Sequence, residues 1–301
     1  MLPFYCPIIP GEHLLSWLNR IHLLLGFNSI KQTLKYLNIS NEYFAISRFN
    51  GPIKGALGLY ENNTSDGFSG FDKHTTLPIW ALSMEPTKYQ KMRLEPAESA
   101  TYDSQKPRII CQENWKYCHQ CVKEDIEQIG HSIWRVHHQI IGITHCIKHK
   151  IRLCEDGKKL RDLRYSDLPQ VHSLTNSHLS NHPSLVEWSE FLSRTLDILC
   201  ECPERAFQVK KKVRSFLQIP KKIIRTDEFS EQSLELKERL ETELPPEVYR
   251  HMFRINPVNR MRDVNPINIT MGWKSPLYQS DIPHPIYWLV ILFWLRNNIV
   301  I

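Results

Sequence analysis

Glycine is scarce in this chain, with 11 glycines among 301 residues against 19 prolines. Loops that cradle nucleotide phosphates need several closely spaced glycines, so the sequence has little material for them. It contains no Gly-x₄-Gly-Lys-Ser/Thr motif, since Gly157-Lys158-Lys159 lacks both the upstream glycine and the hydroxyl. The composition therefore favours short helices punctuated by proline and argues against a nucleotide-binding loop.

Long apolar runs are also missing. The longest run, residues 286–295, has ten residues and is stopped by Arg296. This is about half of what a membrane span needs, so we expect a buried terminal helix and no membrane association. The first residues show no basic stretch followed by an apolar one, so no secretory signal is expected. The eight cysteines are too few for a disulfide scaffold and favour a reducing, cytoplasmic environment.

The overall composition is that of a globular protein. Hydrophobic residues make up 42% of the chain and charged residues 23%, a balance that excludes collagen-like and wholly disordered classes. The length suggests two or three domains. A net charge of +6 is compatible with nucleic-acid contact, although local basic patches have to support that interpretation.

The N-terminal part has the pattern of short helices. Apolar residues recur with helical period over residues 14–25, and Gly26 stands where such a helix would end. Ser29 and Gln32 have the spacing of a capping box, which predicts a second helix, and a third is expected from about Ser40. Three such helices suit a helix-turn-helix module, and a plain helical hairpin is the alternative. The polar face of the second helix would carry Lys31, Gln32, Thr33 and Lys35.

The rest of the chain divides into segments of different character. Residues 50–76 and 101–107 are predicted to be loop and linker, and a cysteine- and histidine-rich segment covers residues 111–154. We predict a mainly α protein with an N-terminal helix-turn-helix-like module (1–105), a zinc-binding module (106–160) and a C-terminal helical domain (161–301). Further helices are predicted over residues 86–99, 184–200, 204–217, 229–252 and 285–297.

Two pairs of metal-type residues stand in the central segment. Cys118 and Cys121 form a Cys-x-x-Cys pair, and Cys146 and His149 repeat the spacing after 24 intervening residues. Each pair can occupy two neighbouring vertices of one tetrahedral ion, so the four predict a closed Cys₃His zinc site. With no vertex left for water, the zinc would be structural and would support folding of the segment.

Other residues remain alternatives for one ligand or for a second site. Within the segment, these are His119, His137, His138, His145, Cys111 and Cys154. Packing or surface exposure is the simpler role for each of them. Outside it, Cys200 and Cys202 form an isolated Cys-x-Cys pair that lacks a partner pair.

The sequence lacks two motifs that are typical of metal-dependent enzymes. No histidine is followed two places later by glutamate, as zinc deaminases require, and no His-Glu-x-x-His motif is present. Glu124, Asp125 and Glu127 would suit a zinc-dependent nuclease only if they converged on metal. A solvated helix face explains these three carboxylates better, so no catalytic residue is assigned.

Basic residues cluster in the C-terminal part. Such clusters suit phosphate neutralisation, and the alternative for each is a solvated helix face. Combined with a helix-turn-helix candidate and a zinc module, they favour nucleic-acid contact. The clusters consist of Lys210, Lys211, Lys212, Arg214, Lys221, Lys222 and Arg225, and of Arg254, Arg260 and Arg262.

The opening of the chain, residues 7–26, contains a distinctive combination of residues after a proline-rich lead. It consists of Glu12, Leu14, Ser16, Trp17, Leu18, Arg20 and Gly26. This combination resembles the TniQ/TnsD family of transposon target-selection proteins, whose members begin with a proline-rich lead, then Glu-Ser-Leu-x-Ser-Trp-Leu-x-Arg and a later glycine. The chain departs from that pattern at His13, which replaces the first serine.

The zinc segment resembles the same family more closely, so that the similarity extends over roughly residues 3–155. The family run is Tyr-Cys-Pro-x-Cys, then Trp-Arg-x-x-His-Gln-Leu-Pro-Gly and Cys-x-x-His. His119 and Ile141 occupy the places of its two prolines. The matching positions are Tyr117, Cys118, Cys121, Trp134, Arg135, His138, Gln139, Gly142, Cys146 and His149.

The resemblance implies a non-enzymatic target selector of a bacterial transposon. Such a protein would join a target-recognition complex on DNA, here an RNA-guided CRISPR effector, to the AAA+ ATPase that regulates transposition. The alternative within the family is a TnsD-like protein that binds an attachment sequence directly, and a homodimer stays open. Cys118, Cys121, Cys146 and His149 would hold zinc, and Trp134, His138 and Gln139 would shape the chain between the ligand pairs. Lys31, Gln32, Lys35 and the basic residues at 210–222 are the candidates for nucleic-acid or partner contact.

Overall fold

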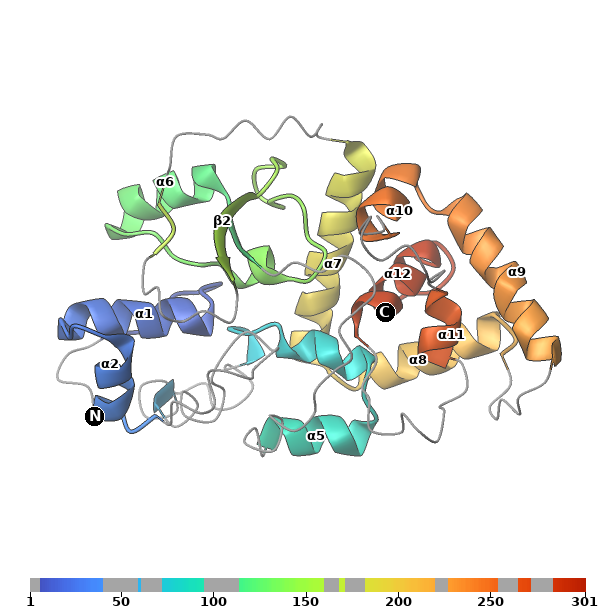
Figure 1. Ribbon diagram of the computed structural model, residues 1–301, viewed down its shortest axis with the longest axis horizontal. Helices are drawn as coiled ribbons and strands as arrows, with labels where there is room; N and C mark the ends of the chain where they lie inside the picture. The colour runs from blue at the N-terminus through green and yellow to red at the C-terminus, as the bar shows by residue number, and fades with distance from the viewer. Residues whose placement is uncertain are drawn as a thin grey trace.

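The computed structural model describes residues 6–39, 59–60, 72–94, 114–159, 168–170, 182–219, 227–253, 265–271 and 284–301. In these ranges the chain is mainly helical, with one two-stranded antiparallel sheet (Figure 1). The predicted mainly α class is confirmed. No helix in the described ranges is both long and apolar enough to cross a membrane.

The first two predicted helices are present as α1 (Leu14–Leu25) and α2 (Ile30–Tyr36). Gly26 ends α1 in a left-handed conformation with φ 67°, which glycine adopts without steric cost, and Ser29 caps α2. One detail of the prediction is wrong: Thr33 is buried rather than on a polar face, because its hydroxyl contacts His22 Nδ1 at 2.5 Å. The predicted third helix lies outside the described residues, so the helix-turn-helix remains a prediction.

The next described segment combines a 3₁₀ helix, η2 (Leu77–Leu82), with helix α5 (Pro86–Leu94). Pro78 stands in the first turn of η2, where a missing N–H costs nothing. Every residue of η2 is buried. The pattern of the sequence predicted α5 but gave no signal for η2.

The central module contains the sheet. Strand β1 (Asn114–Tyr117) pairs with β2 (Cys154–Lys159), with Tyr117 opposite Cys154. Helix α6 (His119–Ile129) follows β1 directly, and a 3₁₀ turn, η4 (Val136–Gln139), leads toward the second ligand pair. Gly130 ends α6 in the left-handed region with φ 80°.

The described residues of the C-terminal part form six helices. The predicted helices at 184–200 and 204–217 are present as α7 and α8. The single helix predicted over 229–252 is wrong: α9 and α10 are separate, because Pro245 cannot donate a backbone hydrogen bond and restricts the residue before it. The bounds are α7 (Pro183–Glu201), α8 (Arg205–Phe216), α9 (Asp227–Glu243), α10 (Pro246–Phe253), α11 (Pro266–Met271) and α12 (Ile286–Trp294).

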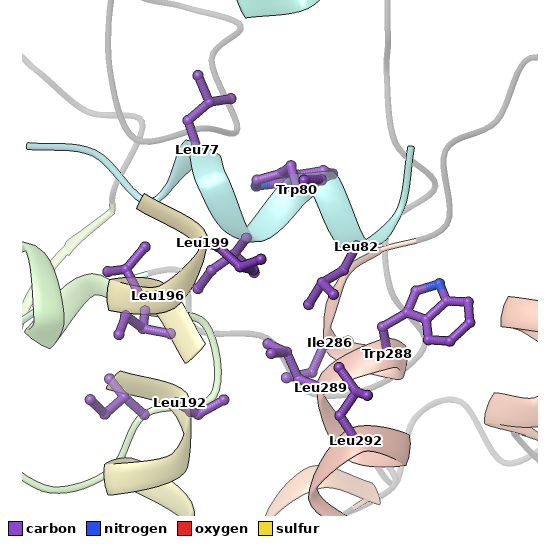
Figure 2. Close-up of a cluster of buried hydrophobic side chains, with 14 of the residues drawn as sticks. Leu77, Trp80, Leu82, Leu192, Leu196, Leu199, Ile286, Trp288, Leu289 and Leu292 are labelled. Atoms are coloured by element: carbon purple, nitrogen blue, oxygen red, sulfur yellow. The ribbon is translucent and has the colours of Figure 1, made fainter. Parts of the chain in front are cut away.

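Helix α12 is buried along its whole length, which explains why its sequence is apolar on every side. Figure 2 shows Ile286 and Leu289 of α12 on the side that faces α7 and Leu82 of η2, so that a segment from the first third of the sequence completes the C-terminal core. The labelled residues are Leu77, Trp80 and Leu82 from η2, Leu192, Leu196 and Leu199 from α7, and Ile286, Trp288, Leu289 and Leu292 from α12.

Buried apolar side chains form one continuous cluster that extends from Cys6 to Ile299. The cluster crosses the predicted boundaries between residues 105 and 106 and between 160 and 161. The three-module division therefore remains a prediction about the sequence, whereas the packing joins the modules into one core.

Candidate metal centre

The first ligand pair lies where β1 passes into α6. Cys118 is the N-cap residue of α6, with extended backbone, and Cys121 lies in the first helical turn. The Val122 N–H donates to Cys118 O at 3.0 Å, which closes that turn. Both thiols are buried, with 0% exposure at Cys118 and 3% at Cys121.

The second pair lies on a tight turn between two short extended segments. His145 and Arg152 form an antiparallel bridge around this turn. The Cys146 N–H donates to Ile151 O at 2.8 Å, and the Lys150 N–H donates back to Cys146 O at 2.8 Å. Lys150 adopts a left-handed conformation with φ 55°, which closes the turn. Cys146 and His149 are thereby held on one side of the turn, facing the first pair.

The four side chains converge on one point. His149 Nδ1 lies 3.3 Å from the sulfur of Cys118, 3.4 Å from that of Cys121 and 3.7 Å from that of Cys146. The sulfurs of Cys121 and Cys146 are 3.7 Å apart. Within the described part of the chain, these four residues form the group of histidine, cysteine and acidic side chains that could hold a metal ion.

These separations fit a zinc tetrahedron. Zinc bonds of about 2.3 Å to sulfur and about 2.0 Å to nitrogen give tetrahedral edges of roughly 3.7 Å between sulfurs and 3.5 Å between sulfur and nitrogen. A disulfide would need sulfurs about 2.05 Å apart, so the cysteines are not placed for one. The thiols of Cys118 and Cys146, followed by burial, raise the pKa of Cys121. A divalent cation would compensate the negative charge of three thiolates held this close together.

Two of the alternative ligands, His137 and Cys200, have other contacts. His137 Nε2 lies 2.8 Å from Asp197 Oδ1, and the Cys200 thiol donates to Asp72 O at 3.6 Å. Burial raises the pKa of Cys200 to about 12, as expected of an unreactive core thiol. Cys154 lies on β2 outside the group of four, and Cys111 lies outside the described residues.

The acidic residues of α6 do not share one exposed face, so that part of the sequence interpretation is wrong. Asp125 is 3% exposed and forms an ion pair with Arg135, whereas Glu127 is exposed. Burial raises the pKa of Asp125 despite the opposing effect of Arg135. Glu124 contacts His149 and Lys148. The three carboxylates thus have three different environments and do not converge as a two-metal nuclease site would require.

The family-like opening residues connect α1 to the zinc module. Glu12 forms a buried ion pair with Arg20 at 2.6 Å, and Trp17 Nε1 donates to Cys6 O at 2.7 Å. The Ser16 hydroxyl accepts from the Trp134 N–H at 3.0 Å, and Trp134 O accepts from the His13 N–H at 2.7 Å. The bonds of Ser16 and His13 to Trp134 join the two parts, whereas those of Glu12 and Trp17 hold the N-terminal part together.

The side chains of Gln139 and Lys116 form hydrogen bonds that connect β1 to the chain between the two ligand pairs. Gln139 Oε1 accepts from the Lys116 N–H at 3.1 Å, and Gln139 Nε2 donates to Lys116 O at 2.8 Å. Lys116 Nζ in turn donates to Ile143 O at 2.7 Å, and burial lowers the pKa of this ammonium to about 8. Both contacts tie β1 to the segment that precedes Cys146.

The predicted contact residues fall into two groups. Lys31, Gln32, Lys35 and Lys211 are exposed, and Lys212 is exposed with its Nζ 3.5 Å from Val300 O. Lys210 instead donates to Ala81 O and Met84 O, and Arg214 donates to Met271 O at 3.0 Å. These two cations connect α8 to neighbouring segments, whereas Lys221 and Lys222 lie outside the described residues.

Comparison with known families agrees with this arrangement. The model of the TniQ family matches residues 3–153, which is about half of the chain and includes both α1 and all four candidate ligands. The chain belongs to the TniQ family. TniQ proteins are transposon-associated target-selection proteins. None of the curated proteins matches the chain.

Proposed function

We propose that this TniQ protein is a non-enzymatic adaptor of a bacterial transposon. It would join a target-recognition complex on DNA, namely an RNA-guided CRISPR effector, to the AAA+ ATPase that regulates insertion. The observation that carries the proposal is the TniQ match over residues 3–153, in which the opening motif and the metal-type residues build one packed unit.

Zinc is the cofactor proposed for this unit. Cys118, Cys121, Cys146 and His149 would fill all four vertices of one ion, which leaves no position for water or substrate. The ion would supply folding free energy rather than chemistry. Its function would be to hold β1, α6 and the second turn in the arrangement against which α1 packs.

Co-purification tests the adaptor proposal. The purified protein, with one zinc per chain confirmed, is mixed at physiological salt with an RNA-guided surveillance complex from its transposon, with the AAA+ ATPase, or with duplex DNA alone. We expect stable complexes with the two protein assemblies and weak, unselective binding to DNA. Cys121→Ser should abolish both complexes, whereas the control Cys202→Ser, which changes a thiol outside the metal group, should leave them intact. Failure of the wild-type protein to bind either assembly would refute the adaptor role.

A second candidate function is direct reading of an attachment sequence. The observation that favours it is the exposure of Lys31, Gln32 and Lys35 along α2, which would suit a helix placed on DNA. We would expect this second function, rather than the adaptor function, if the protein binds one duplex selected from a random pool tightly. The affinity should then fall steeply as the salt concentration rises.

The lysines of α2 give a quantitative form of that test. Each lysine that contacts a phosphate contributes about one to the slope of log affinity against log salt. If α2 contacts DNA, Lys31→Ala combined with Lys35→Ala should lower this slope by about two. A Lys123→Ala change, on the exposed side of α6, is the control and should leave the slope unchanged. An unchanged slope in the double variant removes α2 from the DNA contact.

A further inference from the structure

Glu124 lies beside the candidate zinc site without being one of its ligands. We propose that Glu124 is a positioning residue that holds His149 in the orientation and tautomer that bind the metal, and that Lys148 holds Glu124 in place. This role rests on the proposed zinc site.

The two ring nitrogens of His149 face different partners. Nδ1 points to the three sulfurs at 3.3–3.7 Å, whereas Nε2 lies 3.0 Å from Glu124 Oε1. The other carboxylate oxygen of Glu124 accepts from Lys148 Nζ at 2.6 Å. The carboxylate therefore bridges the metal ligand and the lysine that precedes it in the sequence.

Helix geometry explains how Glu124 reaches this position. Cys121 and Glu124 are three residues apart on α6, so both side chains lie on the same side of the helix. The helix that supplies one metal ligand thus also supplies the carboxylate. On the opposite turn, Lys148 and His149 are neighbours in sequence, and both reach the same carboxylate.

The chemistry of histidine gives this contact a specific effect. A histidine binds metal through a nitrogen that carries no proton, so Nδ1 ligation requires the proton to be on Nε2. The Glu124 carboxylate accepts a hydrogen bond from that N–H, which favours the metal-binding tautomer and fixes the plane of the ring. Ligand basicity also rises when a carboxylate accepts this bond.

The contact between His149 and Glu124 is partly exposed to solvent. The His149 side chain is 13% exposed, that of Glu124 is 32% exposed and that of Lys148 is 57% exposed. Side-chain exposure therefore increases from His149 through Glu124 to Lys148. Removal of the carboxylate would therefore change the surroundings of His149 without leaving a large cavity in the core.

Chelator competition tests the role of Glu124. Loss of such a partner typically weakens metal binding about 10- to 100-fold, so we expect Glu124→Ala to raise the zinc dissociation constant by this factor. Glu124→Gln retains an oxygen that can accept from Nε2 and should lose less. Lys148→Ala should have a smaller effect than Glu124→Ala because it leaves the carboxylate itself in place. Glu127→Ala removes the same charge from an exposed position of the same helix and is the matched control.

Cobalt substitution separates positioning from general stability. If Glu124 orients His149, the visible absorption bands of the Co²⁺ protein should shift in Glu124→Ala and recover largely in Glu124→Gln. A merely structural role would lower the melting temperature of the metal-free protein and leave the bands unchanged. Should Glu124→Ala fail to fold, the comparison of Glu124→Gln with Glu127→Ala still measures both quantities.

The outcomes distinguish this role from the zinc site on which it rests. Wild-type protein that binds neither zinc nor cobalt would refute the site itself. Wild-type protein that binds zinc, with Glu124→Ala and Glu127→Ala equal to it in affinity and in cobalt bands, would overturn the role of Glu124 and leave the site intact.

Discussion

His13 occupies the beginning of α1 with no exposure to solvent, and burial lowers the pKa of its imidazole to about 3. Its Nδ1 accepts from the Leu15 N–H at 3.1 Å, which a protonated nitrogen could not do. The ring also lies edge-on to Trp115 at 5.1 Å. The histidine therefore performs the capping function that the serine of the TniQ pattern would perform at this position.

This environment makes stability depend on pH. The folded protein keeps His13 neutral, whereas the unfolded chain takes up a proton near pH 6.5, so the free energy of unfolding should fall as pH drops below about 6.5. Between pH 7 and pH 5 the loss from this group is about 2 kcal/mol. His13→Asn keeps a capping oxygen and does not titrate, so its urea-unfolding free energy should fall by about 2 kcal/mol less over this interval.

His182 provides the control. It caps α7 by accepting from the Ser184 N–H at 3.4 Å, but its side chain is 41% exposed. His182→Asn is compared with His13→Asn, and both variants are measured with zinc at saturating concentration. The interpretation fails if His13→Asn and His182→Asn change the pH dependence equally.

The ion pair of Glu12 and Arg20 gives a second prediction about single residues. Glu12 is fully buried, accepts two hydrogen bonds from the Arg20 guanidinium and one from the Ile9 N–H. Arg20→Met would leave a buried carboxylate without its cation and should cost about 3–5 kcal/mol of unfolding free energy. Adding Glu12→Gln removes the uncompensated charge and should recover part of the loss in urea titrations. A double variant less stable than Arg20→Met would contradict this account.

Among the elements, the loop at Gly142 is the point where the zinc module meets the C-terminal helices. Gly142 has φ 81°, and its carbonyl accepts from Trp188 Nε1 of α7 at 2.9 Å and lies 3.2 Å from His251 Nε2 of α10. A Cβ at this position would lie 3.0 Å from Ile286 Cδ1 of α12 and 3.4 Å from Trp188 Cζ2. Three helices thus close around one glycine.

Gly142→Ala should therefore be more destabilising than a glycine substitution that only strains the backbone. Gly130 is the matched control, because it has φ 80° and open space around the added Cβ. We expect Gly130→Ala to cost about 1 kcal/mol and Gly142→Ala to cost about 1–3 kcal/mol more, measured by chemical denaturation. Equal costs at the two glycines would show that the helices yield to the added methyl group.

Elements with strong local signals were predictable from sequence, and those that depend on distant partners were not. The apolar period of α1, the Ser29 cap of α2 and the two ligand spacings all lie within a few residues. The buried 3₁₀ helix η2 has no such period, since its burial depends on α7, α8 and α12, which come much later in the chain (Figure 2). Asp125 was assigned to an exposed face because its partner Arg135 comes from beyond the helix.

At the scale of the whole molecule, the candidate zinc site is connected to the C-terminal helices. The Ser189 hydroxyl of α7 accepts from the backbone N–H groups of Thr144 and His145, next to Cys146. Zinc removal should therefore loosen more than the segment that holds the ion. In hydrogen exchange, we expect chelation, or Cys146→Ser, to reduce protection over residues 114–153 and also in α7.

The described part of α9, which lies on the other side of the C-terminal helices in Figure 1, serves as the internal control and should lose less protection than α7. Unchanged protection and melting after chelation, in protein shown to have contained zinc, would contradict a structural role for the metal. Loss confined to residues 114–153 would instead show that the module folds independently of α7.

The bonds between α1 and Trp134 also affect the order in which the chain can fold. Ser16 and Trp134 are 118 residues apart, and at about 5–20 residues per second a ribosome needs roughly 6–24 s to make that distance. Until then, the Ser16 hydroxyl and the His13 N–H lack the Trp134 backbone groups that they bind in the folded protein. The nascent helix thus passes through an interval in which it is exposed to chaperones and to aggregation, and synthesis of the zinc module ends that interval.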